Sequence, residues 1–273
     1  MAHATDLRHV QRVLWTAGGA RRYAVISGKG GVGKTVITAN LAAALAGSGQ
    51  RILVVDADLG LANLDVVLGV NPSGTIQDVF AGQLAVDQAI IHTRCGFDLL
   101  PAGSALLETS CFTPSLAANV ADLLEKIESR YDAILFDAGA GIGEVVLFFA
   151  RLADDIVLIV TPEPTSIMDA YAAVKVLALR YGCTDIRLVV NQADPKRPEQ
   201  SGIQVANHLQ KVVNRFLSAE CGSPVRLHLA GSLPSDPAVG EAIRQRQLLF
   251  ETDPCTPVAQ GIPRLAKCLR TAL

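Results

Sequence analysis

The glycine- and lysine-rich stretch Ser27–Thr35 contains residue types that bind phosphate groups. The apolar run Tyr23–Ile26 precedes it and predicts a buried strand. The following run, Val36–Ser48, has no proline and no glycine before Gly47, which predicts a helix. At a strand-to-helix turn, unpaired backbone N–H groups and the helix dipole favour an anion. We therefore expect an anion-binding site at this turn.

Two nucleotide-binding motifs overlap here. Gly28, Gly30 and Gly33 match the pattern G-x-G-x-x-G of dinucleotide-binding proteins. In such a protein Asp56, at the end of the next expected strand, would bind the ribose. Residues 28–35 also match G-x-x-x-x-G-K-[ST], the phosphate loop of nucleoside triphosphatases.

Lys34 and Thr35 distinguish the two motifs. A dinucleotide pyrophosphate requires close backbone approach but no ammonium group, whereas the β- and γ-phosphates of ATP with Mg²⁺ require a cation and a hydroxyl ligand. The sequence therefore favours ATP, with Lys34 on the phosphates and Thr35 on Mg²⁺. The expected nucleotide-binding residues of the loop are Gly28, Lys29, Gly30, Gly31, Val32, Gly33, Lys34, Thr35 and Val36.

Two further expected strands end in acidic residues. Arg51–Asp56 is followed by Asp58, and Tyr131–Asp137 ends in an acid itself. The carboxyl ends of parallel strands face the ligand crevice. Asp58 there would orient or deprotonate an attacking water, Asp56 would assist Mg²⁺ or the loop, and Asp137 would hold the Mg²⁺ water shell. The expected metal site comprises Thr35, Asp58 and Asp137.

Three other positions are expected to face the nucleotide. Gly141 belongs to a glycine-rich segment after Asp137 that could move when a γ-phosphate is present or lost. Asn191 ends the expected strand Ile186–Asn191, and its amide suits an adenine edge, although a turn role is the alternative. Pro234 lies in the crevice loop after the last expected strand.

Strands alternate with helices along the chain, which predicts a doubly wound, mostly parallel sheet with helices on both faces. Residues 21–273 are expected to form a single domain. Residues 1–20 precede its first strand, and their apolar and basic residues suggest either a packed helix or a docking segment for a partner.

Composition limits the other function classes. The 24 basic and 26 acidic side chains give a net charge of −2, so no direct nucleic-acid binding is expected. The nearest candidate for a membrane span, Val145–Val160, is interrupted by Arg151, Asp154 and Asp155. No secretory segment is expected at the N-terminus. The expected location is therefore the cytoplasm.

The C-terminal apolar stripe leaves two possibilities. Ile262, Leu265, Leu269 and Leu273 recur at helical spacing beside basic residues. This stripe would be either an interfacial anchor at the inner face of the cell membrane or the last helix of the core.

Lys29 adds a second lysine to the loop Gly-Lys-Gly-Gly-Val-Gly-Lys-Thr, which resembles the deviant Walker A box of the ParA/MinD ATPases. The resemblance extends over residues 22–270. It implies an ATP-dependent homodimer in which Lys29 reaches the partner's nucleotide. It also implies that Lys34 and Lys29 act on the phosphates, that Asp58 positions water, and that Asn191 contacts adenine.

Finer features resemble the flagellar-number regulators FlhG and FleN. These are Asp56–Asp65, Asp137–Ile142 and Thr161–Ser166, followed by Asp169-Ala170-Tyr171. The resemblance implies slow, partner-stimulated ATP hydrolysis. It also implies control of flagellum number and placement through an FlhF-type GTPase, a FleQ-type activator and switch-ring proteins.

Other functions remain to be compared with this one. A MinD-like protein would place the division site, and a pure binding module would sequester an activator with incidental hydrolysis. A nitrogenase-reductase relative needs a cluster-binding cysteine after Asp137, the residue that corresponds to the switch acid of the family by resemblance. Ala138–Val146 contains no cysteine.

Overall fold

The computed structural model describes residues 19–58, 63–103 and 113–271. The expectations for the docking segment before residue 19, for residues 59–62 of the segment Asp56–Asp65, and for Leu273 lie outside these ranges.

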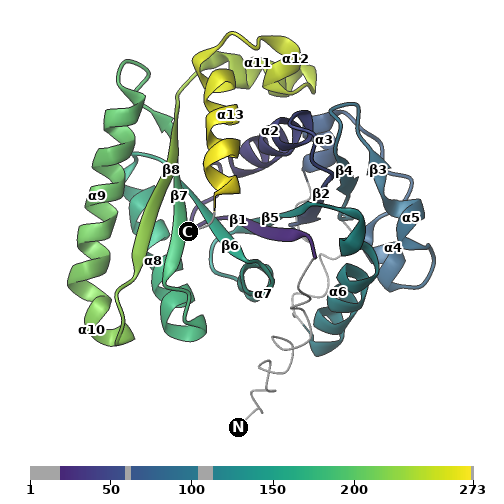
Figure 1. Cartoon of the computed structure of the whole chain (residues 1–273), viewed down its shortest axis with the longest axis horizontal. Coiled ribbons are helices and arrows are strands. Elements are labelled where there is room, and N and C mark those ends of the chain that lie inside the picture. Colours follow the sequence, from purple (N-terminus) through teal and green to yellow (C-terminus); the bar gives the residue numbers. More distant parts are fainter. Residues whose placement is uncertain (1–18, 59–62, 104–112, 272–273) are drawn as a thin grey trace.

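An eight-stranded sheet organises the molecule, with strand order β3-β4-β2-β5-β1-β6-β7-β8 (Figure 1). Its strands are parallel except for the edge pair β3 and β4, which is antiparallel. The mostly parallel sheet was predicted, but the short edge strand β3 was not. The strands are β1 (Arg21–Ser27), β2 (Ile52–Ala57), β3 (Ile91–His92), β4 (Asp98–Leu100), β5 (Ala133–Ala140), β6 (Asp155–Val160), β7 (Asp185–Ala193) and β8 (Arg226–Pro234).

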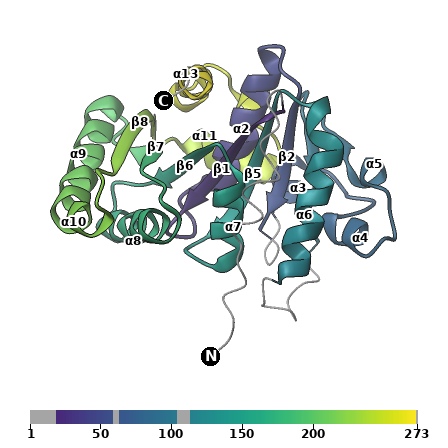
Figure 2. The same ribbon diagram turned by 60° about the horizontal axis from the view of Figure 1, so that its bottom comes forward.

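Helices cover both faces of the sheet, as the alternating pattern predicted (Figure 2). One face carries α2 (Lys34–Gly47), α3 (Leu64–Leu68), α11 (Pro237–Gln245), α12 (Leu249–Thr252) and α13 (Pro257–Arg270). The other apolar cluster includes residues of α4 (Ile76–Phe80), α5 (Val86–Ala89), α6 (Pro114–Ile127), α7 (Glu144–Leu152), α8 (Pro164–Tyr181), α9 (Pro198–Phe216) and α10 (Ser218–Cys221). The 3₁₀ turn Glu128–Arg130 follows α6.

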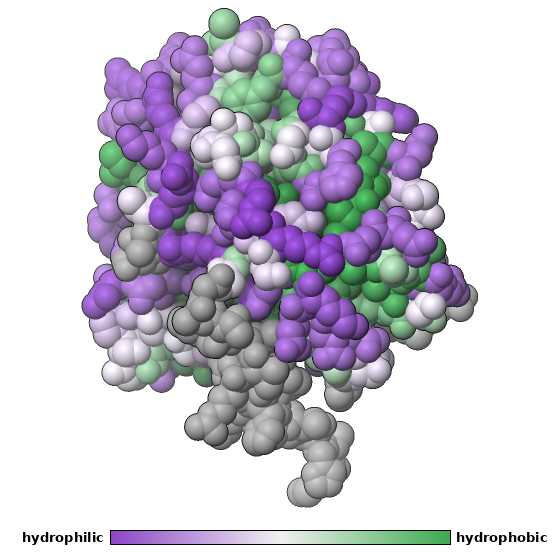
Figure 3. Space-filling model, turned by 45° about the vertical axis from the view of Figure 1, so that its right-hand side comes forward, coloured by the Kyte–Doolittle hydropathy of each residue, from purple (hydrophilic) through white to green (hydrophobic). Residues whose placement is uncertain are grey.

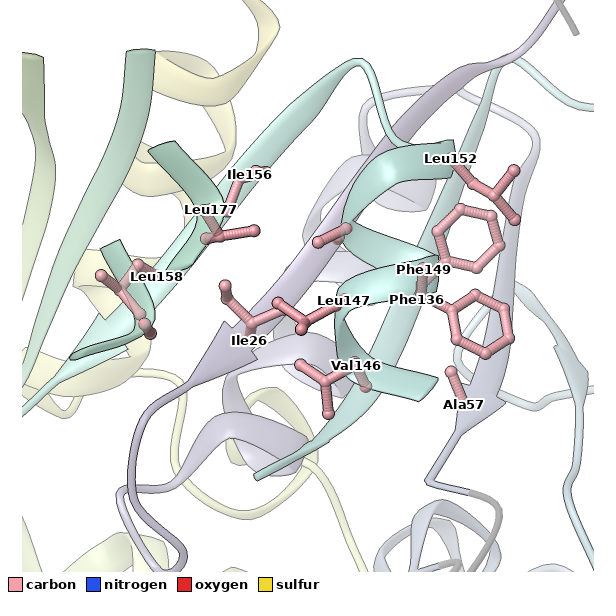
Figure 4. Close-up of a cluster of buried hydrophobic side chains, with 14 of the residues drawn as sticks. Ile26, Ala57, Phe136, Val146, Leu147, Phe149, Leu152, Ile156, Leu158 and Leu177 are labelled. Carbon is pink, nitrogen blue, oxygen red and sulfur yellow. The ribbon is translucent and has the colours of Figure 1, made fainter. Parts of the chain in front are cut away.

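Helix α7 packs directly on the central strands (Figure 4). Its Phe149 ring lies 5.1 Å from the Phe136 ring of β5, centroid to centroid, and both residues are fully buried. The sequence analysis noted that Arg151, Asp154 and Asp155 interrupt the apolar stretch Val145–Val160. The structure divides it into α7 and β6 because Asp154 accepts a hydrogen bond from the Arg22 backbone and so fixes the turn between them.

The apolar stripe of α13 belongs to the core. Ile262, Leu265 and Leu269 are each 1% exposed and pack in the cluster that contains α2. The interpretation as an interfacial anchor is therefore wrong for these residues, and the alternative of a last core helix is correct. Within the ranges that the structure describes, no helix is long and apolar enough to cross a bilayer.

The molecular surface combines polar and apolar side chains. In Figure 3, bands of hydrophilic residues cross a face on which apolar residues are visible between them. Among the described residues, Met168 of α8 and Val66 of α3 are large apolar side chains that are 66% and 52% exposed. Helix α3 follows the segment that contains the expected site residue Asp58.

Candidate functional site

The phosphate loop connects β1 to α2 at the carboxyl edge of the sheet, where parallel α/β proteins bind ligands. Gly31 and Gly33 have φ values of 76° and 86°, a region that favours glycine. A Cβ atom on Gly28 would lie 2.3 Å from the backbone of Asp169 in α8. The loop is therefore a backbone cradle of the kind that binds phosphate oxygens.

Lys34 forms a buried ion pair at the start of α2. Its Nζ lies 2.8 Å from Oδ1 of Asp137, and the two side chains are 8% and 2% exposed. The Thr38 hydroxyl, one helical turn further along α2, lies 2.9 Å from the same oxygen. Sequence reasoning missed Thr38, although its i+4 spacing from Lys34 places both on one helix face. The expected phosphate lysine and the expected switch acid are thus adjacent.

Asp56 lies beside Asp137 in the register of β2 and β5 and is 1% exposed. Burial, and secondly the charge of Asp137, raise the pKa of Asp56 to about 7. Its carboxylate accepts hydrogen bonds from the backbone N–H groups of Asp58 at 3.1 Å and of Leu64 at 3.4 Å. Of the two roles expected for Asp56, these contacts support the one in the loop.

Asp58 is half-buried and lies next to the end of β5. A Cβ atom on Gly139 would be 3.5 Å from Cγ of Asp58. The structure therefore places the expected water-positioning acid beside Gly139, two residues after Asp137 in the chain. Gly141, with a φ of 89°, donates a backbone hydrogen bond to the Ser27 carbonyl at 2.8 Å, so the glycine-rich segment is attached to the phosphate loop.

Lys29 makes contacts within its own chain. Its Nζ lies 2.7 Å from Oε2 of Glu163 and 3.0 Å from Oγ1 of Thr165, both at the start of α8. Sequence reasoning singled out the segment Thr161–Ser166 by resemblance but assigned it no contact with Lys29. The loop and α8 are therefore joined by an exposed ion pair.

A cavity of about 290 Å³ opens beside the loop. Its lining includes the expected residues Val36, Asn191 and Pro234 from three separate segments. Their roles toward a base stay predictions. Sequence reasoning missed the apolar side of this cavity, because no local pattern shows that helices near the C-terminus return to the loop: Val239, Ile243, Leu249, Val258 and Ile262.

The donor set fits a nucleoside triphosphate with Mg²⁺. The glycine cradle offers N–H groups, Lys34 an ammonium group, Thr35 a hydroxyl at the first turn of α2, and Asp58 and Asp137 carboxylates. The adjacent apolar cavity has room for a base. The fold and the site together define a P-loop nucleotide-binding protein.

Comparisons with known proteins agree with this class. The family model of an AAA domain matches residues 20–179. The antiactivator FleN of Pseudomonas aeruginosa is 38% identical over 89% of this chain and 84% of its own length. The flagellum site-determining protein YlxH of Helicobacter pylori is 32% identical over 94% of this chain and 84% of its own length.

A solved structure has a similar fold. The septum site-determining protein MinD of Pyrococcus horikoshii, complexed with Mg-ADP, has a TM-score of 0.73 and 26% identity, covering 92% of this chain and 96% of that one. The chain belongs to the ParA/MinD family of P-loop ATPases. The predicted family and the predicted resemblance to flagellar-number regulators are both confirmed.

Proposed function

We propose that the protein is an ATP-dependent switch that controls the number and placement of flagella. Its ATP-bound form would be a homodimer that recruits or inhibits partners, and slow hydrolysis would end that state. The observation that carries the proposal is the second lysine of the phosphate loop, Lys29, at the edge of a complete P-loop site. The similarity to FleN and YlxH supports the flagellar role.

Each residue of the site has one chemical task in this proposal. When bound, Mg-ATP would supply a γ-phosphoryl group for transfer to water. Lys34 and the loop N–H groups would neutralise phosphate charge, and Thr35 and Asp137 would hold Mg²⁺ through a hydroxyl and a water shell. Asp58 would orient the attacking water.

Dimerisation depends on Lys29 in this account. The lysine would leave Glu163 and reach the phosphates of the partner protomer, where a cation stabilises the charge of the transition state. An exposed ion pair contributes only about 0–1 kcal/mol, so exchanging Glu163 for a phosphate group is energetically accessible. Loss of the contact between Lys29 and the start of α8 would then make the exposed surface of α8, which includes Met168, differ between the nucleotide states.

The partners would be proteins of flagellar assembly. The name of FleN, an antiactivator, supports a transcriptional activator of the FleQ type as one partner. The name of YlxH, a flagellum site-determining protein, supports a role in flagellar placement, for which the family resemblance implies an FlhF-type GTPase and switch-ring proteins as further partners. Stimulation of hydrolysis would come from one of these partners.

Motility genetics tests the proposal. A deletion strain complemented with the wild-type chain, Lys34→Ala or Asp58→Ala is examined by electron microscopy. We expect normal flagellation only with the wild type, because Lys34→Ala would lose ATP binding and Asp58→Ala would keep the dimer indefinitely. Normal flagellation with Lys34→Ala would refute the switch. If Asp58→Ala alone restores normal flagellation, the protein is a sequestering module whose hydrolysis is incidental.

The structural similarity to MinD favours one other candidate, placement of the division site. The same strains distinguish it, because that function predicts small anucleate cells with unaltered flagella.

A further inference from the structure

Asn191 contacts the phosphate loop as well as the cavity beside it. Its Nδ2 donates a hydrogen bond to the backbone carbonyl of Val32 at 2.8 Å. A carbonyl can only accept, so the amide nitrogen must face the loop whatever else the side chain does. Among the described residues, Oδ1 of Asn191 accepts no hydrogen bond and remains available to a ligand in the cavity.

Only glycine fits at position 33, because the same amide lies against it. A Cβ atom at this position would lie 2.4 Å from Nδ2 of Asn191, far below any normal contact. Gly33 is also the residue that precedes α2, and its φ of 86° turns the chain into the helix. The amide therefore fills the space that a side chain would occupy at the point where the loop meets the helix.

The end of β7 is built to present Asn191. From Val190 to Ala193 the strand advances three residues, whereas its partner β8 advances two, from Ser232 to Pro234, which defines a β-bulge. Gln192 inside the bulge has a φ of 54°, a left-handed conformation that is uncommon for a residue other than glycine. Bulges re-aim side chains near functional sites, and backbone strain of this kind persists only where the surroundings enforce it.

We propose that Asn191 is a positioning residue for the phosphate loop and holds Val32 and Gly33 in their anion-binding shape from inside the cavity. This goes beyond contact with a base, because it makes the triphosphate site depend on the residue that faces the base site. The inference rests on the proposed function only in taking the loop to bind triphosphate.

Two measurements test this role on the full chain, with Asn191→Ala and a matched control, Ile243→Ala, which changes only the cavity wall on α11. Calorimetry compares Mg-ATP with inorganic tripolyphosphate, which has no base. We expect Asn191→Ala to weaken both ligands about 5- to 10-fold, the effect of one lost hydrogen bond, and Ile243→Ala to weaken Mg-ATP alone. Hydrogen exchange of residues 28–36 without any ligand should accelerate only in Asn191→Ala.

Weaker Mg-ATP binding with unchanged tripolyphosphate binding and unchanged loop exchange would overturn the proposal and leave Asn191 a base contact. If the wild-type chain binds no Mg-ATP, the proposed function fails, whereas the exchange comparison still decides the role of Asn191. Should Asn191→Ala not fold, Asn191→Asp takes its place, since it keeps the shape but cannot donate to Val32.

Discussion

The Lys29 ammonium group lies 2.7 Å from the Glu163 carboxylate of the same chain. The lysine that would reach a second protomer is therefore paired with a residue of its own protomer. The two side chains are 37% and 60% exposed, which keeps the interaction weak and reversible. Release of Lys29 from Glu163 is thus the structural change that the proposed dimer would require of the phosphate loop.

Removing the Glu163 charge should favour the dimer. Glu163→Gln leaves Lys29 without its ionic partner, so less free energy is needed to move it. We expect the ATP concentration that gives half-maximal dimer to fall about 2- to 5-fold, as suits an exposed pair. Sedimentation velocity across an ATP titration measures this. Glu199→Gln, at an exposed position of α9, is the control, and an identical shift in both variants would contradict the assignment.

The Lys34–Asp137 pair should contribute strongly to the free energy of unfolding. Lys34→Met leaves the buried Asp137 charge uncompensated, which costs about 3–5 kcal/mol. Lys34→Met combined with Asp137→Asn should recover most of that loss, since neither charge remains. Urea unfolding measures both variants, and Mg-ATP binding should be absent in each. Equal destabilisation of the single and the double variant would show that the pair is not coupled.

Asp56 should make the nucleotide-free protein less stable as the pH rises. Its pKa of about 7 in the folded chain exceeds the ordinary value of 3.8, so the folded state holds the proton more tightly. That contribution is complete below pH 4 and is lost as the pH passes 7. Between pH 5 and pH 8 the loss amounts to about 2–3 kcal/mol.

Asp56→Asn removes this titration and keeps one oxygen, so it can accept from only one of the two backbone N–H groups, those of Asp58 and Leu64, and the lost bond lowers stability by the same amount at every pH. Relative to the wild type, the variant should therefore gain stability from pH 5 to pH 8. Urea midpoints at the two pH values in the absence of Mg²⁺ give the comparison. A constant difference between the two proteins would mean that Asp56 does not titrate in this range.

Leu265 tests the corrected role of α13. Leu265→Ala should destabilise the fold by about 2–5 kcal/mol, because the side chain is 1% exposed in the core. The exposed neighbour Arg264, changed to alanine, should alter stability by less than about 0.5 kcal/mol. Thermal unfolding measures both. Unchanged stability of Leu265→Ala with lost binding to anionic vesicles would restore the anchor interpretation.

Local pattern was sufficient for the central part of the fold. The run from Ile52 to Val55 is apolar because both faces of the sheet are covered, and such runs can be recognised from sequence alone. Helix α7 was not predicted from the interrupted apolar stretch Val145–Val160, because the turn that ends the helix depends on a distant contact of Asp154.

The positions of the candidate site residues were predictable where a motif or the end of a parallel strand places them, whereas their roles toward a nucleotide stay predictions. The loop and the strand-end acids Asp58 and Asp137 follow from spacing and from the geometry of parallel sheets. The partners Glu163 of Lys29 and Thr38 of Asp137 could not be assigned in this way, because each pairing depends on how separate elements pack. The bulge that aims Asn191 depends on strand register, which no short pattern encodes.

Sedimentation velocity of Asp58→Ala with saturating Mg-ATP tests the central claim most directly, because this variant should bind ATP without hydrolysing it. We predict a stable dimer for Asp58→Ala and a monomer when Lys29→Ala is added to it. A monomer for Asp58→Ala with ATP bound, or a dimer that persists without Lys29, would contradict the account.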